Sequence, residues 1–230
     1  MKKDPRKILS LIRSVVKVGV FPGSNGDKKA CWPNDPFHVL ISTVLSQRTR
    51  DQNTANASER LFFAYNTPYQ IANAPLDRIS ELIRPVGFPD QKAKAIKEIS
   101  RQINEEMDDK VPETIDALIA FPMVGRKTAN CVLAYAFHIP AICVDTHVHR
   151  ISNRIGLVCS ADPEETEEQL RRKVPRDIWI DVNSLMVRFG QTVCLPRKPR
   201  CDICPVSSLC DYYHETVLKK KSEIPSKERG

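Results

Sequence analysis

The clearest chemical signature in this chain is a group of four cysteines near the C-terminus. They follow the spacing C-x6-C-x2-C-x5-C and are Cys194, Cys201, Cys204 and Cys210. Cysteine sulfur can form disulfides, hold a tetrahedral zinc ion or bind an iron-sulfur cluster. Zinc sites usually pair two short C-x2-C units across a longer gap, whereas here one short pair lies between two single cysteines. This asymmetry favours a 4Fe-4S cluster as the cofactor.

A second candidate site lies in the run FPMVGRKTANCVLAYAF, residues 121–137, where a proline, a glycine and two cations precede an apolar helix. A tight turn between two helices would point backbone N–H groups outward at the start of the second helix, where the helix dipole also favours an anion. A DNA phosphate fits such a site. Alone the pattern is weak, because proline and glycine commonly punctuate helices and Lys127 could be an ordinary exposed cation.

An acidic residue, Asp145, follows a short apolar run and precedes a helix in AICVDTHVHR, residues 141–150. The simplest interpretation makes Asp145 the N-cap of that helix. From its local sequence alone, a cap and a catalytic carboxylate are equally good interpretations.

Three motifs, GRKTAN (125–130), VDTH (144–147) and the cysteine run, occur in the order and spacing of the endonuclease III branch of the helix-hairpin-helix DNA glycosylases. The resemblance covers nearly the whole chain. It implies an all-α protein of two helical domains flanking a DNA cleft. One would be a six-helix barrel with the helix-hairpin-helix motif, over 29–139, and the other a 4Fe-4S cluster domain built from 1–28 and 140–218. We expect residues 219–230 to form a basic, disordered tail.

The resemblance implies a bifunctional DNA glycosylase and abasic-site lyase of base excision repair that removes oxidised pyrimidines from duplex DNA. Lys127 resembles the catalytic amine, which displaces the base and holds the opened sugar as a Schiff base before β-elimination. Asp145 resembles the catalytic carboxylate, which helps to activate the amine and stabilises positive charge on the sugar. The expected partner is double-stranded DNA with damaged bases or abasic sites, and the expected state is a monomer.

Side chains from two loops fill the gap left by the extruded base in this family. Arg48, preceded by Gln47, stands where the family usually has a glutamine, which leaves readout of the opposite strand open. Phe88 stands where a leucine is common; an aromatic ring can wedge between bases, and a core position is the alternative. Met123 stands where the hairpin commonly carries its first glycine, so we expect an altered phosphate turn.

The cluster is expected to do no bond chemistry and to fold a basic loop that presents cations to DNA phosphates, the salt-sensitive part of binding. The full set of expected DNA contacts is Gln47, Arg48, Phe88, Val124, Gly125, Arg126, Thr128, Arg197, Lys198 and Arg200.

Helical periodicity dominates the elements that must position these residues. One apolar stripe comprises Ile8, Leu9, Leu11, Ile12, Val15 and Val16, and another runs through residues 37–45. Further helices are predicted at 51–65, 76–84, 90–107, 113–120, 126–138 and 146–155. Asp162, Pro163 and Glu165 predict the start of a helix ending near Lys173. A last helix from Ile178 to Phe189 is expected to stop at Gly190.

The composition, with 41% hydrophobic and 27% charged residues, is ordinary for a globular protein, and the net charge of +7 is compatible with a polyanionic partner. The N-terminus MKKDPRKIL lacks the apolar core of a secretory signal, so we expect an intracellular protein of the cytoplasm or nucleoid, or of the nucleus in a eukaryote. The remaining cysteines are predicted to be buried free thiols. They are Cys31, Cys131, Cys143 and Cys159.

Two alternative functions stay open. A mismatch glycosylase of the same superfamily would act on thymine or uracil opposite guanine, or on adenine opposite an oxidised guanine; such relatives tend to lack a lysine at the position of Lys127, which counts against this class. A non-catalytic DNA-binding module with structural zinc would be colourless, whereas a 4Fe-4S protein is yellow-brown.

Overall fold

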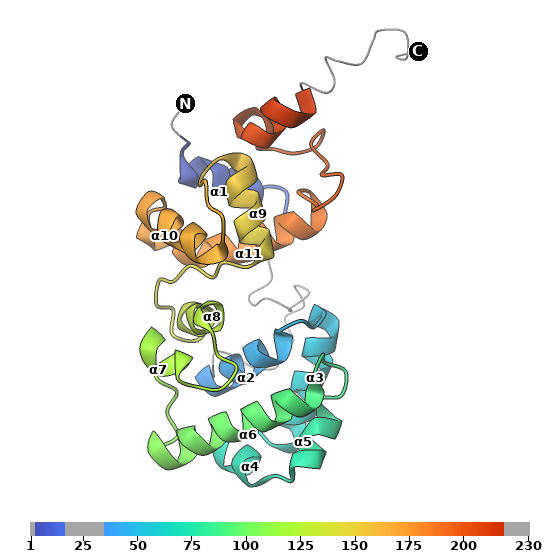
Figure 1. The fold of residues 1–230 in the computed structure, drawn as a ribbon, viewed down its shortest axis with the longest axis vertical. Helices are drawn as coiled ribbons and strands as arrows, with labels where there is room; N and C mark the ends of the chain where they lie inside the picture. Colours follow the sequence, from blue (N-terminus) through green and yellow to red (C-terminus); the bar gives the residue numbers. More distant parts are fainter. Residues whose placement is uncertain (1–2, 17–34, 219–230) are drawn as a thin grey trace. The chain divides into compact units, whose positions relative to one another are not determined.

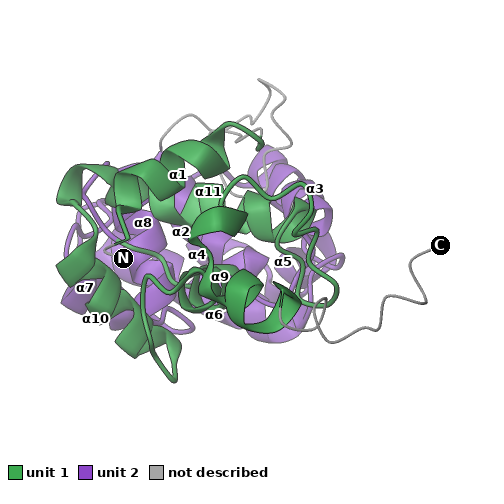
Figure 2. Cartoon of the chain, turned by 90° about the horizontal axis from the view of Figure 1, so that it is seen from above, with its two compact units in different colours: residues 1–18, 142–230 green, residues 19–141 purple. Residues whose placement is uncertain are grey.

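The computed structural model describes residues 3–16 and 35–218, and across these residues the regular secondary structure is entirely helical (Figure 1). The chain folds as two compact units, which Figure 2 shows in separate colours. Unit 1 consists of residues 1–18 and 142–230, and unit 2 of residues 19–141. The all-α prediction is therefore confirmed. No helix in the described part of the chain has the length and apolar character needed to cross a membrane.

Unit 2 is built around one buried helix. Its helices are α2 (Pro36–Ser46), α3 (Asp51–Ala64), α4 (Pro68–Asn73), α5 (Leu76–Leu82), α6 (Pro89–Glu106), α7 (Ile115–Ile119) and α8 (Arg126–Ala136). Helix α2 is buried from Phe37 to Leu45 except at His38, and it packs against α3, α6 and α8. A helix with neighbours on several sides needs an apolar surface on several sides, which explains its unusually apolar sequence. Helix α6 packs against α4 and α5 (Figure 1).

Unit 1 joins the first helix of the chain to its C-terminal part. Its α-helices are α1 (Pro5–Arg13), α9 (Thr146–Ile155), α10 (Pro163–Lys173) and α11 (Trp179–Thr192). A helical turn at Arg176–Ile178 precedes α11, and two more at Ser207–Leu209 and Tyr213–Leu218 follow it. Helix α11 packs against α1 and α9, and the apolar stripe of α1 contributes the fully buried Ile8 and Ile12 to this core.

Proline and polar caps define where many helices start. Proline occupies the first turn of α1, α2, α4, α6 and α10, where a missing N–H costs nothing. The predicted start of α10 is confirmed: the Asp162 side chain accepts from Glu165 N at 2.8 Å. The basic residues of its last turn, Arg171 to Lys173, complement the negative end of the helix dipole.

Three details of the sequence prediction were wrong. Val15 is 45% exposed, because α1 ends at Arg13 and the helical period no longer places Val15 in the core. Helix α11 continues through Gly190 to Thr192. A Cβ at Gly190 would lie 2.3 Å from His147 Nδ1, so this glycine serves close packing against α9 rather than helix termination. Helix α4 was missed, although Thr67 and Pro68 supply its cap and first position.

The prediction that the other cysteines are buried free thiols is confirmed for two of them and wrong for a third. Cys131 and Cys143 are buried, as expected, whereas Cys159 is exposed, so that prediction was wrong. Its backbone is held by Gln169, whose side chain accepts from Cys159 N and donates to Cys159 O, and this leaves the thiol outside the core. Cys31, the domain boundary at residue 28 and the tail 219–230 lie outside the described residues.

Candidate functional site

The helix-hairpin-helix motif of unit 2 consists of α7, a turn and α8. In the turn, Val124 N donates to Phe121 O at 3.1 Å, and Gly125 is the N-cap of α8 without a side-chain hydrogen bond. The first amide bonded back along the helix is that of Ala129, which donates to Gly125 O at 2.9 Å. The preceding first-turn amides have no acceptor within the helix, and a helix end of this kind can bind an anion with the help of the helix dipole.

Open space lies in front of this helix end. A Cβ built on Gly125 would meet no protein atom within 4 Å, so a ligand can approach the backbone closely. Arg126 and Lys127 are exposed in the first turn of α8. The side chains of Val124 and Thr128 are buried instead, so any contact they make with a ligand must use the backbone.

Met123 keeps the left-handed backbone that a glycine would favour at its position, with φ = 60°. The departure from the family pattern therefore changes the side chain and the strain rather than the direction of the chain. For a residue with a Cβ, this conformation costs about 1 kcal/mol. The Gln47 side chain supports the turn, because its Nε2 donates to Met123 O at 2.7 Å and to Thr128 Oγ1 at 3.3 Å.

Arg48 and Phe88, the two expected wedge residues, are both exposed and both belong to unit 2. Phe88 is 53% exposed, which excludes the core position considered as an alternative. Each residue has left-handed backbone, with φ = 50° for Arg48 and φ = 57° for Phe88. Non-glycine residues persist in this region only where their surroundings hold them there.

Asp145, in unit 1, is the N-cap of α9. Its Oδ1 accepts from His147 N at 2.9 Å and from Val148 N at 2.8 Å, so the capping interpretation is confirmed. Both bonds end on the same oxygen of a half-buried carboxylate, which leaves the cap role compatible with a second, catalytic one.

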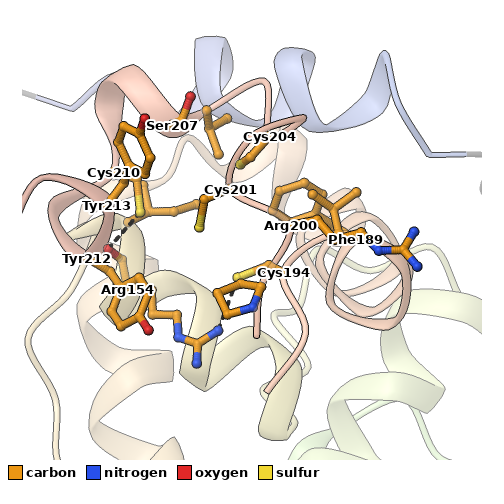
Figure 3. A pocket seen from close by; sticks show the side chains of 14 residues that line it. Arg154, Phe189, Cys194, Arg200, Cys201, Cys204, Ser207, Cys210, Tyr212 and Tyr213 are labelled. Atoms are coloured by element: carbon orange, nitrogen blue, oxygen red, sulfur yellow. Dashed lines mark hydrogen bonds between the residues drawn. The ribbon is translucent and has the colours of Figure 1, made fainter. Parts of the chain in front are cut away.

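The four cysteines line one pocket in unit 1, and Figure 3 shows their side chains around it. Cys210 is buried and the other three are half-buried. Across residues 3–16 and 35–218, no group of three or more histidine, cysteine or acidic side chains is arranged to hold a single metal ion. Burial raises the pKa of the Cys204 thiol to about 11, and burial likewise raises that of Cys210. Four thiols around one pocket fit an all-cysteine iron-sulfur cluster.

Two arginines of α9 that the sequence prediction missed hold the loop after Cys194. Arg150 Nη2 donates to Cys194 O at 2.9 Å, and burial lowers the pKa of its guanidinium. Arg154 donates from Nη1 to Leu195 O and from Nη2 to Pro196 O, both at 2.8 Å. Their spacing of one helical turn along α9 was the available signal, but the sequence does not show that the carbonyls lie opposite.

The basic residues of this loop face outward. Arg197, Lys198 and Arg200 are exposed, Lys198 has φ = 51°, and Arg200 N closes the loop by donating to Val193 O at 2.9 Å. The loop therefore has a fixed backbone and exposed cations, as a phosphate-binding segment requires.

Comparisons with known proteins agree with this arrangement. The family model described as HhH-GPD superfamily base excision DNA repair protein matches residues 41–176, and the iron-sulfur binding domain of endonuclease III matches residues 194–210. Endonuclease III of Thermotoga maritima is 47% identical over 206 residues, covering 90% of this chain and 93% of the relative.

Solved structures are similar over most of the chain as well. A trapped Endonuclease III-DNA covalent intermediate superposes with a TM-score of 0.81 at 30% identity, covering 96% of this chain and 99% of that one. A thermostable thymine-DNA glycosylase superposes with a TM-score of 0.78 at 27% identity, covering 91% and 94%.

Fold and site together define a DNA glycosylase of base excision repair whose cofactor is a 4Fe-4S cluster. The chain belongs to the endonuclease III family of the HhH-GPD superfamily.

Proposed function

We propose that this enzyme excises oxidised pyrimidines from duplex DNA and then cleaves the strand by β-elimination. The observation that carries the proposal is the position of Lys127, an exposed amine in the first turn of α8 directly behind an open helix N-terminus. A phosphate held by that helix end brings a sugar of the same strand within reach of the amine. The enzyme works as a monomer on chromosomal DNA inside the cell.

Lys127 is the nucleophile in this proposal. Its neutral amine attacks C1′ of the sugar, and the glycosidic bond breaks so that its electron pair leaves with the base, which takes up a proton. The sugar ring opens to an imine on Lys127. The imine acidifies the C2′ proton, and loss of that proton expels the 3′ phosphate and cleaves the strand. The relative described as a trapped covalent intermediate supports a covalent route.

Asp145 is the proposed catalytic carboxylate. One oxygen caps α9. The role we propose for the other oxygen is to help remove a proton from the amine and to stabilise positive charge on the sugar. A capped helix end holds this carboxylate in one orientation, so little ordering is needed when the substrate binds.

Arg48 and Phe88 are the proposed wedge, which fills the gap when the damaged base leaves the stack. Their exposure on fixed loops supports this role. The hairpin residues Gly125 and Arg126, with the backbone at Val124 and Thr128, hold the phosphates, and Gln47 supports their turn.

Cys194, Cys201, Cys204 and Cys210 are the proposed cluster ligands. When bound, the cluster ties together the two ends of the segment that contains Arg197, Lys198 and Arg200. These three cations then bind phosphates along the duplex without reading bases.

Borohydride trapping tests the proposal on duplexes that carry an oxidised pyrimidine, an abasic site, or thymine or uracil opposite guanine. The wild-type enzyme is expected to form a trapped complex with the first two, and Lys127→Ala with none, while undamaged DNA binding is retained. Lys94→Ala, which removes an exposed lysine of α6, is the control and should trap normally. Trapping by Lys127→Ala at the wild-type level would overturn the assignment of the nucleophile. Excision of mispaired thymine alone would identify the mismatch class.

A further inference from the structure

A lysine that carries none of the proposed chemistry is buried in unit 2. Lys92, in the first turns of α6, is 1% exposed and is among the largest fully buried side chains of the described residues. Its Nζ donates to Leu45 O at 2.7 Å, to Gln47 O at 2.6 Å and to Thr49 Oγ1 at 3.0 Å. An ammonium has three N–H donors, and here each has an acceptor. Such a group is expensive to bury, and burial lowers its pKa to about 8.

The Thr49 hydroxyl extends this network to a second loop. Thr49 Oγ1 donates to Gln47 O at 3.1 Å and accepts from Gly87 N at 3.1 Å as well as from Lys92. A hydroxyl offers one donor and two acceptor positions, so all of its hydrogen-bonding capacity is used. The α2–α3 loop and the loop before α6 are therefore joined at one point.

Direct packing joins the same two loops. A Cβ built on Gly87 would lie 2.9 Å from Arg48 O, so a larger residue would push the loops apart. Arg48, which precedes Thr49, and Phe88, which follows Gly87, both have left-handed backbone. Two strained residues on adjoining loops need a common support, and Lys92 provides it from inside. Lys92 N also donates to Phe88 O at 3.1 Å, which fixes Phe88 at the start of α6.

We propose that Lys92, together with Thr49, is a positioning residue that locks the Arg48 and Phe88 loops into one arrangement, so that both side chains enter the DNA as a unit when the damaged base leaves the helix. This inference rests on the wedge role proposed above. Lys92 touches neither DNA nor the reacting atoms; it acts through the two loops.

The test compares base excision from two duplexes under single-turnover conditions. In one, the lesion is fully paired; in the other, it lies opposite an abasic site, so that no pairing must be broken for extrusion. Lys92→Met keeps the length of the side chain and removes the donors. We expect it to slow excision from the paired duplex about tenfold or more, because misplaced loops no longer stabilise the extruded state. Excision opposite the abasic site should fall by less than about threefold, since less extrusion energy is required there.

A lysine on the same helix supplies the matched control. Lys97, five residues further along α6, is half-buried, and its Nζ donates to Ala74 O at 2.5 Å instead of to either loop. Lys97→Met removes this single hydrogen bond and should leave the ratio of the two excision rates at the wild-type value. Equal losses on both duplexes for Lys92→Met would show a general structural role and overturn the proposal.

Thr49 keeps the proposal testable if Lys92→Met does not fold. Thr49→Val removes the hydroxyl at nearly constant size and should reproduce the selective loss on the paired duplex, while Thr49→Ser keeps the hydroxyl and should restore the wild-type ratio. Thr49→Val with a wild-type ratio would contradict the proposal. Fluorescence of 2-aminopurine beside the lesion reports extrusion without catalysis. If the wild-type enzyme extrudes the damaged base but does not excise it, the proposed function alone is refuted. If Thr49→Val extrudes the damaged base as well as the wild-type enzyme does, the positioning role alone is refuted.

Discussion

At the scale of single residues, several strained backbone positions fall at the proposed DNA site. Among the described residues, Arg48, Phe88, Met123 and Lys198 have positive φ without being glycine, as do Asp108, Asp109 and His138 outside that site. Each costs about 1 kcal/mol relative to an ordinary conformation, which is a sizeable part of a domain's net stability. Aspartate and histidine adopt this backbone more readily than arginine, phenylalanine or methionine, so the three residues outside the site bear less strain. Strained positions that present side chains outward are typical of functional sites, and the strain at Arg48 and Phe88 supports the wedge assignment.

Asp145→Asn separates the two roles of Asp145. Asparagine caps a helix as well as aspartate does, so the free energy of unfolding should change by less than about 0.5 kcal/mol. Loss of the carboxylate charge should slow base excision at least about a hundredfold, since that charge stabilises the developing cation. Urea unfolding and single-turnover excision measure the two effects. Normal turnover in this variant would leave Asp145 as a cap only.

At the scale of elements, the start of α8 and the start of α7 offer a contrast. Both have an N-cap, but Thr114 caps α7 with its own side chain, accepting from Ala117 N, whereas Gly125 leaves the end of α8 open. A helix end without a side-chain cap can bind water or an anion through its first-turn amides. The missing side-chain cap on α8 therefore supports the proposed phosphate site.

Gly125→Ala tests this use of the helix end. Glycine is a better N-cap than alanine, so the variant should lose up to about 1 kcal/mol of stability, and no protein atom obstructs the new methyl group. The methyl group would occupy the approach to the phosphate, and DNA affinity should fall about tenfold, or 1.4 kcal/mol. Thr114→Ala, the matched cap loss on α7, should lose similar stability and keep its affinity. If Gly125→Ala and Thr114→Ala bind DNA with the same affinity, the proposed phosphate site at the start of α8 is contradicted.

We expect the loop from Leu195 to Arg200 to contact phosphates through its side chains instead of its backbone, and replacing its cations tests this expectation. Replacing Arg197, Lys198 and Arg200 by alanine together should reduce the slope of log affinity against log salt by roughly one unit for each residue. Binding to damaged and undamaged duplex should weaken alike, and the preference among lesions should stay constant, because phosphate contacts carry no base information. If the triple variant keeps the wild-type dependence of affinity on salt, the phosphate contacts must come from another segment, most simply from the hairpin.

At the scale of the whole molecule, each unit has its own hydrophobic core. The segment of unit 1 after Cys194 adds only Val206 and Cys210 to the buried core of that unit, and it consists mostly of short turns held by Arg150 and Arg154 around the four-cysteine pocket. A segment with little core of its own depends on its metal centre for order. Loss of the cluster should therefore affect residues 194–213 far more than unit 2.

Cys204→Ser tests this division. The variant should lose its iron and yellow-brown colour, and hydrogen exchange should lose protection in residues 194–213 while α2, α6 and α8 stay protected. Cys159→Ser, an exposed cysteine away from the pocket, should keep iron at the wild-type level, about four per chain for a 4Fe-4S cluster. Zinc in the wild-type protein would contradict the cluster, and iron retained by Cys204→Ser would contradict its ligand set.

The sequence alone determined the all-α class, most helix positions, the cysteine set and the position of Lys127 in the first turn of a helix after a turn. These features depend on local rules: apolar residues at helical spacing, prolines and polar caps at helix starts, and ligands close together in the chain. The predicted ends of helices were less accurate where tertiary packing determines the residue type. Gly190 is an example, because its lack of a side chain leaves room for His147.

Only the tertiary structure revealed contacts between residues that are distant in the sequence. The sequence does not show that Lys92 lies within 3 Å of carbonyl and hydroxyl oxygens some forty-five residues away, nor that Arg150 and Arg154 face the carbonyls after Cys194. It also treats Arg48 and Phe88 as separate loop residues, whereas Gly87 and Thr49 join their loops. The physical reason is that a buried lysine or arginine finds its hydrogen-bond acceptors among backbone oxygens. Because every residue has a backbone oxygen, no pattern of side chains in the sequence predicts which residues will supply the acceptors.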